Sequence, residues 1–305
     1  MNTDRAITVQ KESLAVLPVT AQPVRVPTRG SADRRDPWYI RYALIGLTLC
    51  IVGGLIVGPL VFIFVQAFAR GLTAYFLALF APPDTRHSIL LTLAVAPLAV
   101  AMNTLFGIAA AWLIARYRFP LRGLLLALID LPFSVSPVVA GLAFVLIFGL
   151  NAPLGAWLKA HGYQVLFAPP GLVLVTAFVT LPFIARELIP VLEAVGPEEE
   201  LAALSLGASA WQTFWMVTLP NVRWGLLYGV ILANARAMGE FGAVYVVSGR
   251  IAGATNTMPL QVDRLFQDHD LPAAFALAGV LTLLALLTLV AKVTVGQRLR
   301  AGESK

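Results

Sequence analysis

Two residues of opposite charge lie four positions apart inside an apolar stretch of the chain. Arg236 and Glu240 fall within a segment long enough to cross a membrane, and on a helix this spacing places both side chains on one face. A charge in the hydrocarbon core costs at least a few kcal/mol, so such residues face protein or water. The pair can neutralise itself and lock one helix against its neighbours. Alternatively, Arg236 can make a polar pathway tolerable for an anion, while Glu240 holds the Arg236 side chain in place.

Other polar residues in apolar segments offer weaker chemistry. Ser134 and Ser136 lie beside prolines, where a hydroxyl could bond the backbone carbonyls that a proline leaves free or could contact a transported substrate. Asp130 follows shortly after a basic segment, and we expect it near a helix end.

No catalytic or metal-binding constellation is recognisable in the sequence. The three histidines are isolated, and no HExxH, CxxC or phosphate-binding glycine loop occurs. The single cysteine, Cys50, cannot form an intrachain disulfide. We therefore expect no catalytic residue, no metal and no cofactor on this chain.

The composition explains why polar chemistry is sparse. Of the 305 residues, 59% are hydrophobic and 12% are charged, whereas soluble domains carry roughly a quarter charged residues. The chain is therefore expected to lie in a lipid bilayer. The net charge is +6, and the positive residues cluster near the ends of apolar segments. We therefore do not expect nucleic-acid binding.

Six apolar stretches reach the about 20 residues that a spanning helix needs, which predicts an all-α polytopic membrane protein. They cover roughly residues 42–68, 88–115, 123–149, 171–194, 225–248 and 273–295. Prolines inside several of them predict kinks, which membrane helices tolerate when neighbours satisfy the freed carbonyls. The expected organisation is a flexible tail over 1–37, a membrane domain over 38–296 and a second tail over 297–305.

The distribution of Lys and Arg predicts the orientation. These residues are more numerous in the two tails, the loop between spans two and three, and the loop between spans four and five than in the other loops, with Arg186 counted in the 4–5 loop. Because cytoplasmic loops carry the excess of positive charge, both termini and the 4–5 loop are expected to be cytoplasmic.

The predicted 4–5 loop, over about residues 196–220, begins like a short helix that ends in a tight turn. Pro197 fits the first helical position, and the three glutamates that follow it fit a first helical turn, where the helix dipole favours negative charge. Gly207 is typical of the left-handed cap that ends a helix.

A second short helix is expected after this turn. Ser209 can cap a helix over 210–218, which Leu219 and Pro220 are expected to end. The loop has more apolar surface than a solvated loop needs, from Leu201, Leu204, Trp211, Phe214 and Trp215. This surface either packs on the chain's own membrane helices or contacts a partner protein.

The spacing within this loop is similar to a family motif. Ala202 and Ala203, followed by Gly207 and then by Leu219-Pro220, resemble the EAA loop of bacterial ABC-importer permeases. In that family the first helix of the loop, the coupling helix, docks into a groove on the ATP-binding subunit. The resemblance implies a coupling role for Glu200, Leu201, Ala202, Ala203, Gly207, Ala208, Leu219 and Pro220.

The chain departs from the motif at two positions. Leu201 replaces the leading glutamate, with Glu200 one residue earlier, and Val217 stands where isoleucine is usual. The resemblance therefore assigns no role to that particular carboxylate, and we expect coupling to rest on shape and apolar contact.

The resemblance extends over roughly residues 40–295. The chain is similar to permeases for tetrahedral oxyanions, with sulfate/thiosulfate permeases the nearest, in the runs 130–137, 181–190, 224–230, 234–244, 247–250 and 258–260. It implies a MetI-like permease fold in the bacterial inner membrane. It also implies a sister permease, a dimer of ATP-binding subunits that binds ATP and Mg²⁺, and a periplasmic sulfate-binding protein.

Other functions are less consistent with the sequence. A permease for molybdate, tungstate or phosphate would share the same pattern. An ion-coupled secondary transporter would be expected to show inverted repeats and more intramembrane carboxylates. An intramembrane enzyme would need a nucleophile–base or metal constellation.

Overall fold

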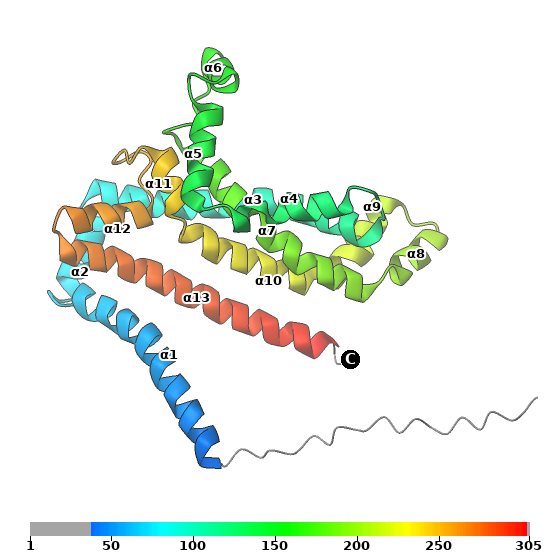
Figure 1. The fold of residues 1–305 in the computed structure, drawn as a ribbon, viewed down its shortest axis with the longest axis horizontal. Helices are drawn as coiled ribbons and strands as arrows, with labels where there is room; N and C mark the ends of the chain where they lie inside the picture. The colour runs from blue at the N-terminus through cyan, green and yellow to red at the C-terminus, as the bar shows by residue number, and fades with distance from the viewer. Residues whose placement is uncertain (1–37, 304–305) are drawn as a thin grey trace, which may run out of the picture. The chain divides into compact units, whose positions relative to one another are not determined.

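The computed structural model describes residues 38–303, with side chains to residue 296, and its secondary structure is helical throughout. The expected tail over 1–37 lies outside the described residues. The chain divides into two units at Leu55, within α1 (Trp38–Ala67). All helices after α1 belong to the second unit (Figure 1).

Five helices of the described chain are long and apolar enough to span a membrane. They are α1, α3 (Pro83–Arg116), α7 (Pro169–Val195), the continuous helix Ala210–Met238, and α13 (Leu271–Glu303). A sixth span results if α4 (Arg122–Ser134) and α5 (Pro137–Phe148) are counted as one. The all-α class and the number of about six spans are confirmed, and α13 continues past residue 296 to Glu303.

The third predicted span is broken rather than kinked. α4 and α5 meet at 108°, and the break lies at Val135 and Ser136, both of which have extended backbone. The ring of Pro137 disfavours helical backbone at Ser136, while its own fixed φ suits the first residue of a new helix. The expected span over 123–149 therefore consists of two helices, and the kink expected at this proline is a break between them.

The fifth predicted span, over 225–248, was also misplaced. α10 (Leu219–Met238) ends before Gly239, and a separate short helix, α11, covers Gly242–Ser248. Arg236 consequently lies in the last turn of α10, and Glu240 lies in the break between the two helices.

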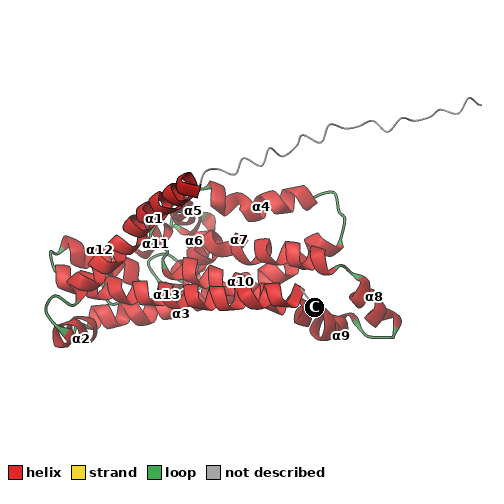
Figure 2. Ribbon diagram, turned by 90° about the horizontal axis from the view of Figure 1, so that it is seen from below, coloured by secondary structure: helices red, strands yellow, loops and turns green. Residues whose placement is uncertain are grey.

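The centre of the second unit is formed by α3, α7 and α10, which run side by side (Figures 1 and 2). α3 and α7 approach closely because Gly107 has no side chain: a Cβ there would lie 2.8 Å from Cγ2 of Ile184. Asn103 joins the same helices by donating to the Ala177 carbonyl and the Thr180 hydroxyl, both at 2.9 Å. A buried amide is thus satisfied where lipid could not satisfy it.

Short helices flank this centre. α8 (Glu198–Ser205) and α9 (Ala210–Thr213) follow the last residue of α7. α2 (Leu72–Phe80) and α12 (Met258–Gln267) pack with α13 through an apolar cluster that includes Tyr75, Leu79, Met258 and Leu277. α5 packs against α11 and leads to α6 (Pro153–Ala160).

Candidate coupling loop and intramembrane charges

The loop that follows α7 contains the tight turn that its glycine predicted. Gly207 has a φ of +90°, a conformation that side chains with a Cβ rarely adopt. The Ala208 amide donates to the Ala203 carbonyl and the Gly207 amide donates to the Leu204 carbonyl, both at 3.0 Å. This pair of bonds is the Schellman arrangement, so α8 ends at a defined place and the chain reverses there. Pro197 immediately precedes the first residue of α8.

The second part of the loop begins as predicted but does not end as predicted. Ser209 accepts from the Gln212 amide at 3.2 Å, and the Gln212 side chain accepts from the Ser209 amide at 2.9 Å, which is a capping box. The expected end at Leu219 and Pro220 was wrong, because the helix continues through the π-helical turn Phe214–Thr218 into α10. That wider turn accommodates the ring of Pro220 and its missing N–H.

Glu200 lies at the centre of the contacts that hold the loop to the membrane helices. Its two carboxylate oxygens accept from Nε and a terminal nitrogen of Arg116, at 2.9 and 3.0 Å, and one of them also accepts from the Thr218 hydroxyl at 2.9 Å. Arg116 additionally donates to the Leu192 carbonyl at 2.8 Å. The loop is thereby attached to the ends of α3 and α7 and to the π-helical turn.

This ion pair is largely shielded from solvent. The side chains of Arg116 and Glu200 are 9% and 13% exposed, so the attraction between them is weakened little by water. Sequence reasoning missed the pair because it considered this glutamate only as part of a first helical turn and by its place in the motif. The available signal was Arg116 itself, a basic residue at the end of a span that faces the acidic start of the loop.

The apolar side of the loop is not covered by the part of the chain that the structure describes. Leu201 is 58% exposed and Trp211 is 69% exposed. Leu204, Leu206, Trp215 and Met216 are exposed too, whereas Phe214 is half-buried. Of the two alternatives, packing on the chain's own membrane helices is seen within the described residues only for Phe214.

Arg236 and Glu240 form an ion pair with 2.5 Å between the charged atoms. The Glu240 side chain is 1% exposed, and its other oxygen accepts from the Ala243 amide at 3.1 Å. This carboxylate therefore neutralises the arginine and also satisfies the first turn of α11.

A second intramembrane pair was not predicted. Arg186 lies inside α7 rather than in the 4–5 loop, and Asp130 lies within α4 rather than at its end. Nε of Arg186 donates to one Asp130 oxygen at 2.6 Å, and a terminal nitrogen donates to the other at 2.5 Å. The placement of Arg186 was wrong, because this residue was judged without the partner that neutralises it.

The two serines lie at the break between α4 and α5. Ser134 is the last residue of α4 and Ser136 immediately precedes α5, and both are exposed. Within the described chain, neither hydroxyl makes a hydrogen bond, so neither serves a carbonyl freed by a proline.

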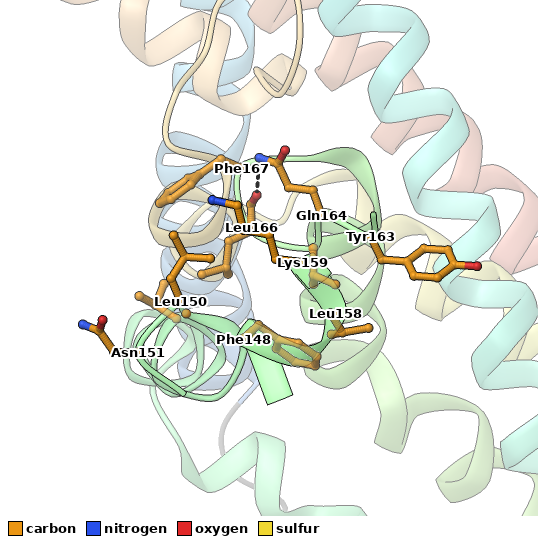
Figure 3. A pocket seen from close by; sticks show the side chains of 13 residues that line it. Phe148, Leu150, Asn151, Leu158, Lys159, Tyr163, Gln164, Leu166 and Phe167 are labelled. Carbon is orange, nitrogen blue, oxygen red and sulfur yellow. Dashed lines mark hydrogen bonds between the residues drawn. The ribbon is translucent and has the colours of Figure 1, made fainter. Parts of the chain in front are cut away.

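A pocket of about 460 Å³ lies where α5, α6 and the following segment meet (Figure 3). Its lining is mostly apolar, and the Gln164 side chain donates to the carbonyl of Leu166 in the same segment at 3.1 Å. Lys159 is the single charged side chain in the lining. The described residues offer no carboxylate or second cation there for binding a charged ligand.

These features define a multi-pass helical membrane protein with a helical hairpin held at one end of its bundle. Residues 103–301 match the family model described as "Binding-protein-dependent transport system inner membrane component". The chain belongs to this family, so it is an inner-membrane permease component of a binding-protein-dependent transport system.

Individual relatives support this assignment. The chain is 51% identical over 273 residues to the sulfate transport system permease protein CysW of Escherichia coli (strain K12), covering 90% of this chain and 94% of that protein. It is 41% identical over 204 residues to the sulfate transport system permease protein CysT of the same organism, covering 67% and 74%. The crystal structure of a bacterial alginate ABC transporter in complex with an alginate pentasaccharide-bound periplasmic protein includes a chain of similar fold. Its TM-score is 0.67 at 18% identity, covering 84% of this chain and 92% of that one.

We predict that Glu200→Gln loosens the loop without unfolding the membrane helices. The variant leaves the largely buried Arg116 without its counter-charge, which is costly. Hydrogen exchange of the backbone amides in 201–206 should become on the order of tenfold faster. Mass spectrometry of the purified complex measures this.

Glu193→Gln is the matched control, because Glu193 pairs with Arg122 at 2.8 Å with both side chains more than 40% exposed. Exposed pairs contribute about 0–1 kcal/mol, so exchange in the loop should not change. Equal protection in the wild type and in Glu200→Gln would contradict the holding role.

Proposed function

We propose that this chain is a permease subunit of an ABC importer for sulfate or thiosulfate. The observation that carries the proposal is the 51% identity, over 90% of the chain, to a protein named as a sulfate transport system permease. We propose that residues 38–296 form the membrane domain and that a sister permease similar to CysT completes the pathway. A periplasmic sulfate-binding protein would deliver the anion.

The energy would come from a partner. The sequence contains no phosphate-binding glycine loop, so ATP and Mg²⁺ would bind to an ATPase dimer in the cytoplasm. We place the 196–220 loop and both termini on that side, because basic residues remain in excess there after Arg186 is assigned to α7.

The exposed apolar side of α8 suits docking of a helix into a groove. Leu201, Leu204 and Leu206 are exposed while Glu200 points back to Arg116, so the helix has one face for the ATPase and one for its own membrane domain. Closure of the ATPase dimer would pull on α8, and the Arg116–Glu200 pair would pass the movement to α3. The spans would then expose the pathway to each side in turn.

Uptake measurements test the transport function. Proteoliposomes that contain the complete importer should take up radiolabelled sulfate only with internal ATP and an external sulfate-binding protein. Excess thiosulfate should compete with sulfate, whereas molybdate should not. Uptake driven by an ion gradient without ATP would contradict the proposal, as would uptake of molybdate in preference to sulfate.

Gly207→Val tests the coupling loop. A β-branched residue is strained at a φ of +90°, so the α8–α9 turn should deform. We expect normal insertion of the spans. Uptake should fall by at least about tenfold, because the strain of about 1–3 kcal/mol at this position corresponds to a factor of that order. Gly123→Val is the control, because Gly123 has a negative φ and a Cβ added there would have no heavy atom within 4 Å. Uptake unchanged in Gly207→Val would count against docking through this hairpin.

We propose that Arg236 and Glu240 hold the junction between α10 and α11 rather than contact the anion. The burial of Glu240 and its bond to the α11 backbone support this role. Arg236→Gln would leave a buried carboxylate unpaired, a change that costs about 3–5 kcal/mol in other proteins.

Arg236→Gln should therefore lower the amount of assembled complex in membranes, and the double change with Glu240→Gln should restore part of it. Blue-native electrophoresis measures both. A variant that assembles normally and hydrolyses ATP but imports no sulfate would instead place Arg236 in the pathway.

A further inference from the structure

The Arg186–Asp130 pair lies well inside the membrane domain and is open on one side. Arg186 lies about 13 Å of helix before the end of α7 at Val195. The side chains of Arg186 and Asp130 are 57% and 33% exposed. A charged pair at such a depth does not face lipid, so the exposed side must face water or another protein chain.

Arg186 differs from Arg236 in how firmly its partner is held. Glu240, the partner of Arg236, is buried and bonded to the backbone of α11. Asp130 makes no hydrogen bond other than those to Arg186 within the described chain. Its carboxylate can therefore move away without breaking a helix cap.

The surroundings would keep Arg186 in place if Asp130 moved. Its guanidinium lies 5.8 Å from the centre of the Phe133 ring, a favourable cation–π distance. The Phe133 ring in turn packs edge-on against Phe183, at 5.3 Å. Ser134, four residues after Asp130 and on the same face of α4, adds an exposed hydroxyl without a partner in the described chain.

We propose that Arg186 faces the translocation pathway and is the cation that the transported oxyanion meets within the membrane, with Asp130 as its displaceable counter-ion. This inference rests on the proposed function, because it requires an anionic substrate. The planar guanidinium matches the oxygens of a tetrahedral oxyanion in a bidentate manner. A permanently free arginine would hold the anion, whereas a competing carboxylate allows it to leave, as a conducting site requires.

The alternative is that the pair only fastens α4 to α7. The chain contains a matched control, because Arg122 and Glu193 join the same two helices with an exposed pair at 2.8 Å. Neutral variants of that pair remove a similar link between the helices and leave the charge at Arg186 unchanged.

Thiol labelling tests the local charge without any transport measurement. In the complete importer, Cys50→Ser removes the single cysteine of this chain, and Ser134→Cys introduces one beside the pair. Reaction rates are compared for a methanethiosulfonate that carries a sulfonate and for one that carries a trimethylammonium group, with and without ATP and vanadate.

We expect Ser134→Cys to react in at least one nucleotide state. The ratio of anionic to cationic labelling should fall on the order of tenfold in Arg186→Gln, should rise in Asp130→Asn, and should stay unchanged in Arg122→Gln. Arg186→Lys keeps the charge, so it should keep most of the ratio even if Arg186→Gln assembles poorly. No reaction in any nucleotide state, or a ratio that is indifferent to Asp130→Asn, would overturn the proposal.

Sulfate uptake provides the second test. The double variant Arg186→Gln/Asp130→Asn keeps two hydrogen-bonding amides and no charge, so it should assemble and hydrolyse ATP but lose at least tenfold in uptake. The double variant Arg122→Gln/Glu193→Gln should transport normally. Normal uptake in the first double variant would refute the role of Arg186. If the wild-type importer proved not to carry sulfate, the transport function would fail, whereas the labelling ratio would still report the charge in the pathway.

Discussion

Lipid offers no hydrogen bonds to a backbone, so each interruption of a helix in the membrane domain must be satisfied by protein or covered by it. Among the residues that the structure describes, two such interruptions lie before Pro137 and after Met238, and they are placed against each other. A Cβ on Gly242 would lie 3.2 Å from Cβ of Pro137. Glu240 supplies an acceptor where α11 begins. The unbroken helices α3 and α7 pack beside this junction through a buried apolar cluster that includes Ala99, Val175 and Val244.

The parts of the fold that depend on a short stretch of sequence were predictable. Apolar length identified the long helices, Gly207 identified the left-handed turn, and Ser209 identified the cap that follows it. Prolines were less informative, because their effect depends on neighbours. Pro132 lies inside α4, Pro137 breaks the chain by 108°, and Pro220 is accommodated by a π-helical turn. The sequence shows that a proline cannot donate a backbone hydrogen bond, but it does not show which structural element compensates for the missing bond.

Charges were the hardest feature to place. Arg186 was counted with the 4–5 loop although it lies within the predicted span over 171–194, because the compensating Asp130 lies on another helix and was not considered. Glu200 was judged by lying one residue before the motif's leading position. In the structure, its side chain is held by Arg116 at the end of α3. In both cases the partner is remote in sequence, and only the packing of α3, α4 and α7 brings the two charges together.

The π-helical turn at Phe214–Thr218 makes α9 and α10 one continuous rod of 29 residues. Such a rod is about 43 Å long, and it runs from the hairpin to the junction with α11. Because no loop interrupts it, the rod would act as a lever: a tilt of about 5° at one end would displace the other by about 4 Å. A movement too small to break the contacts around Glu200 could thus become several ångströms at the break before Gly242.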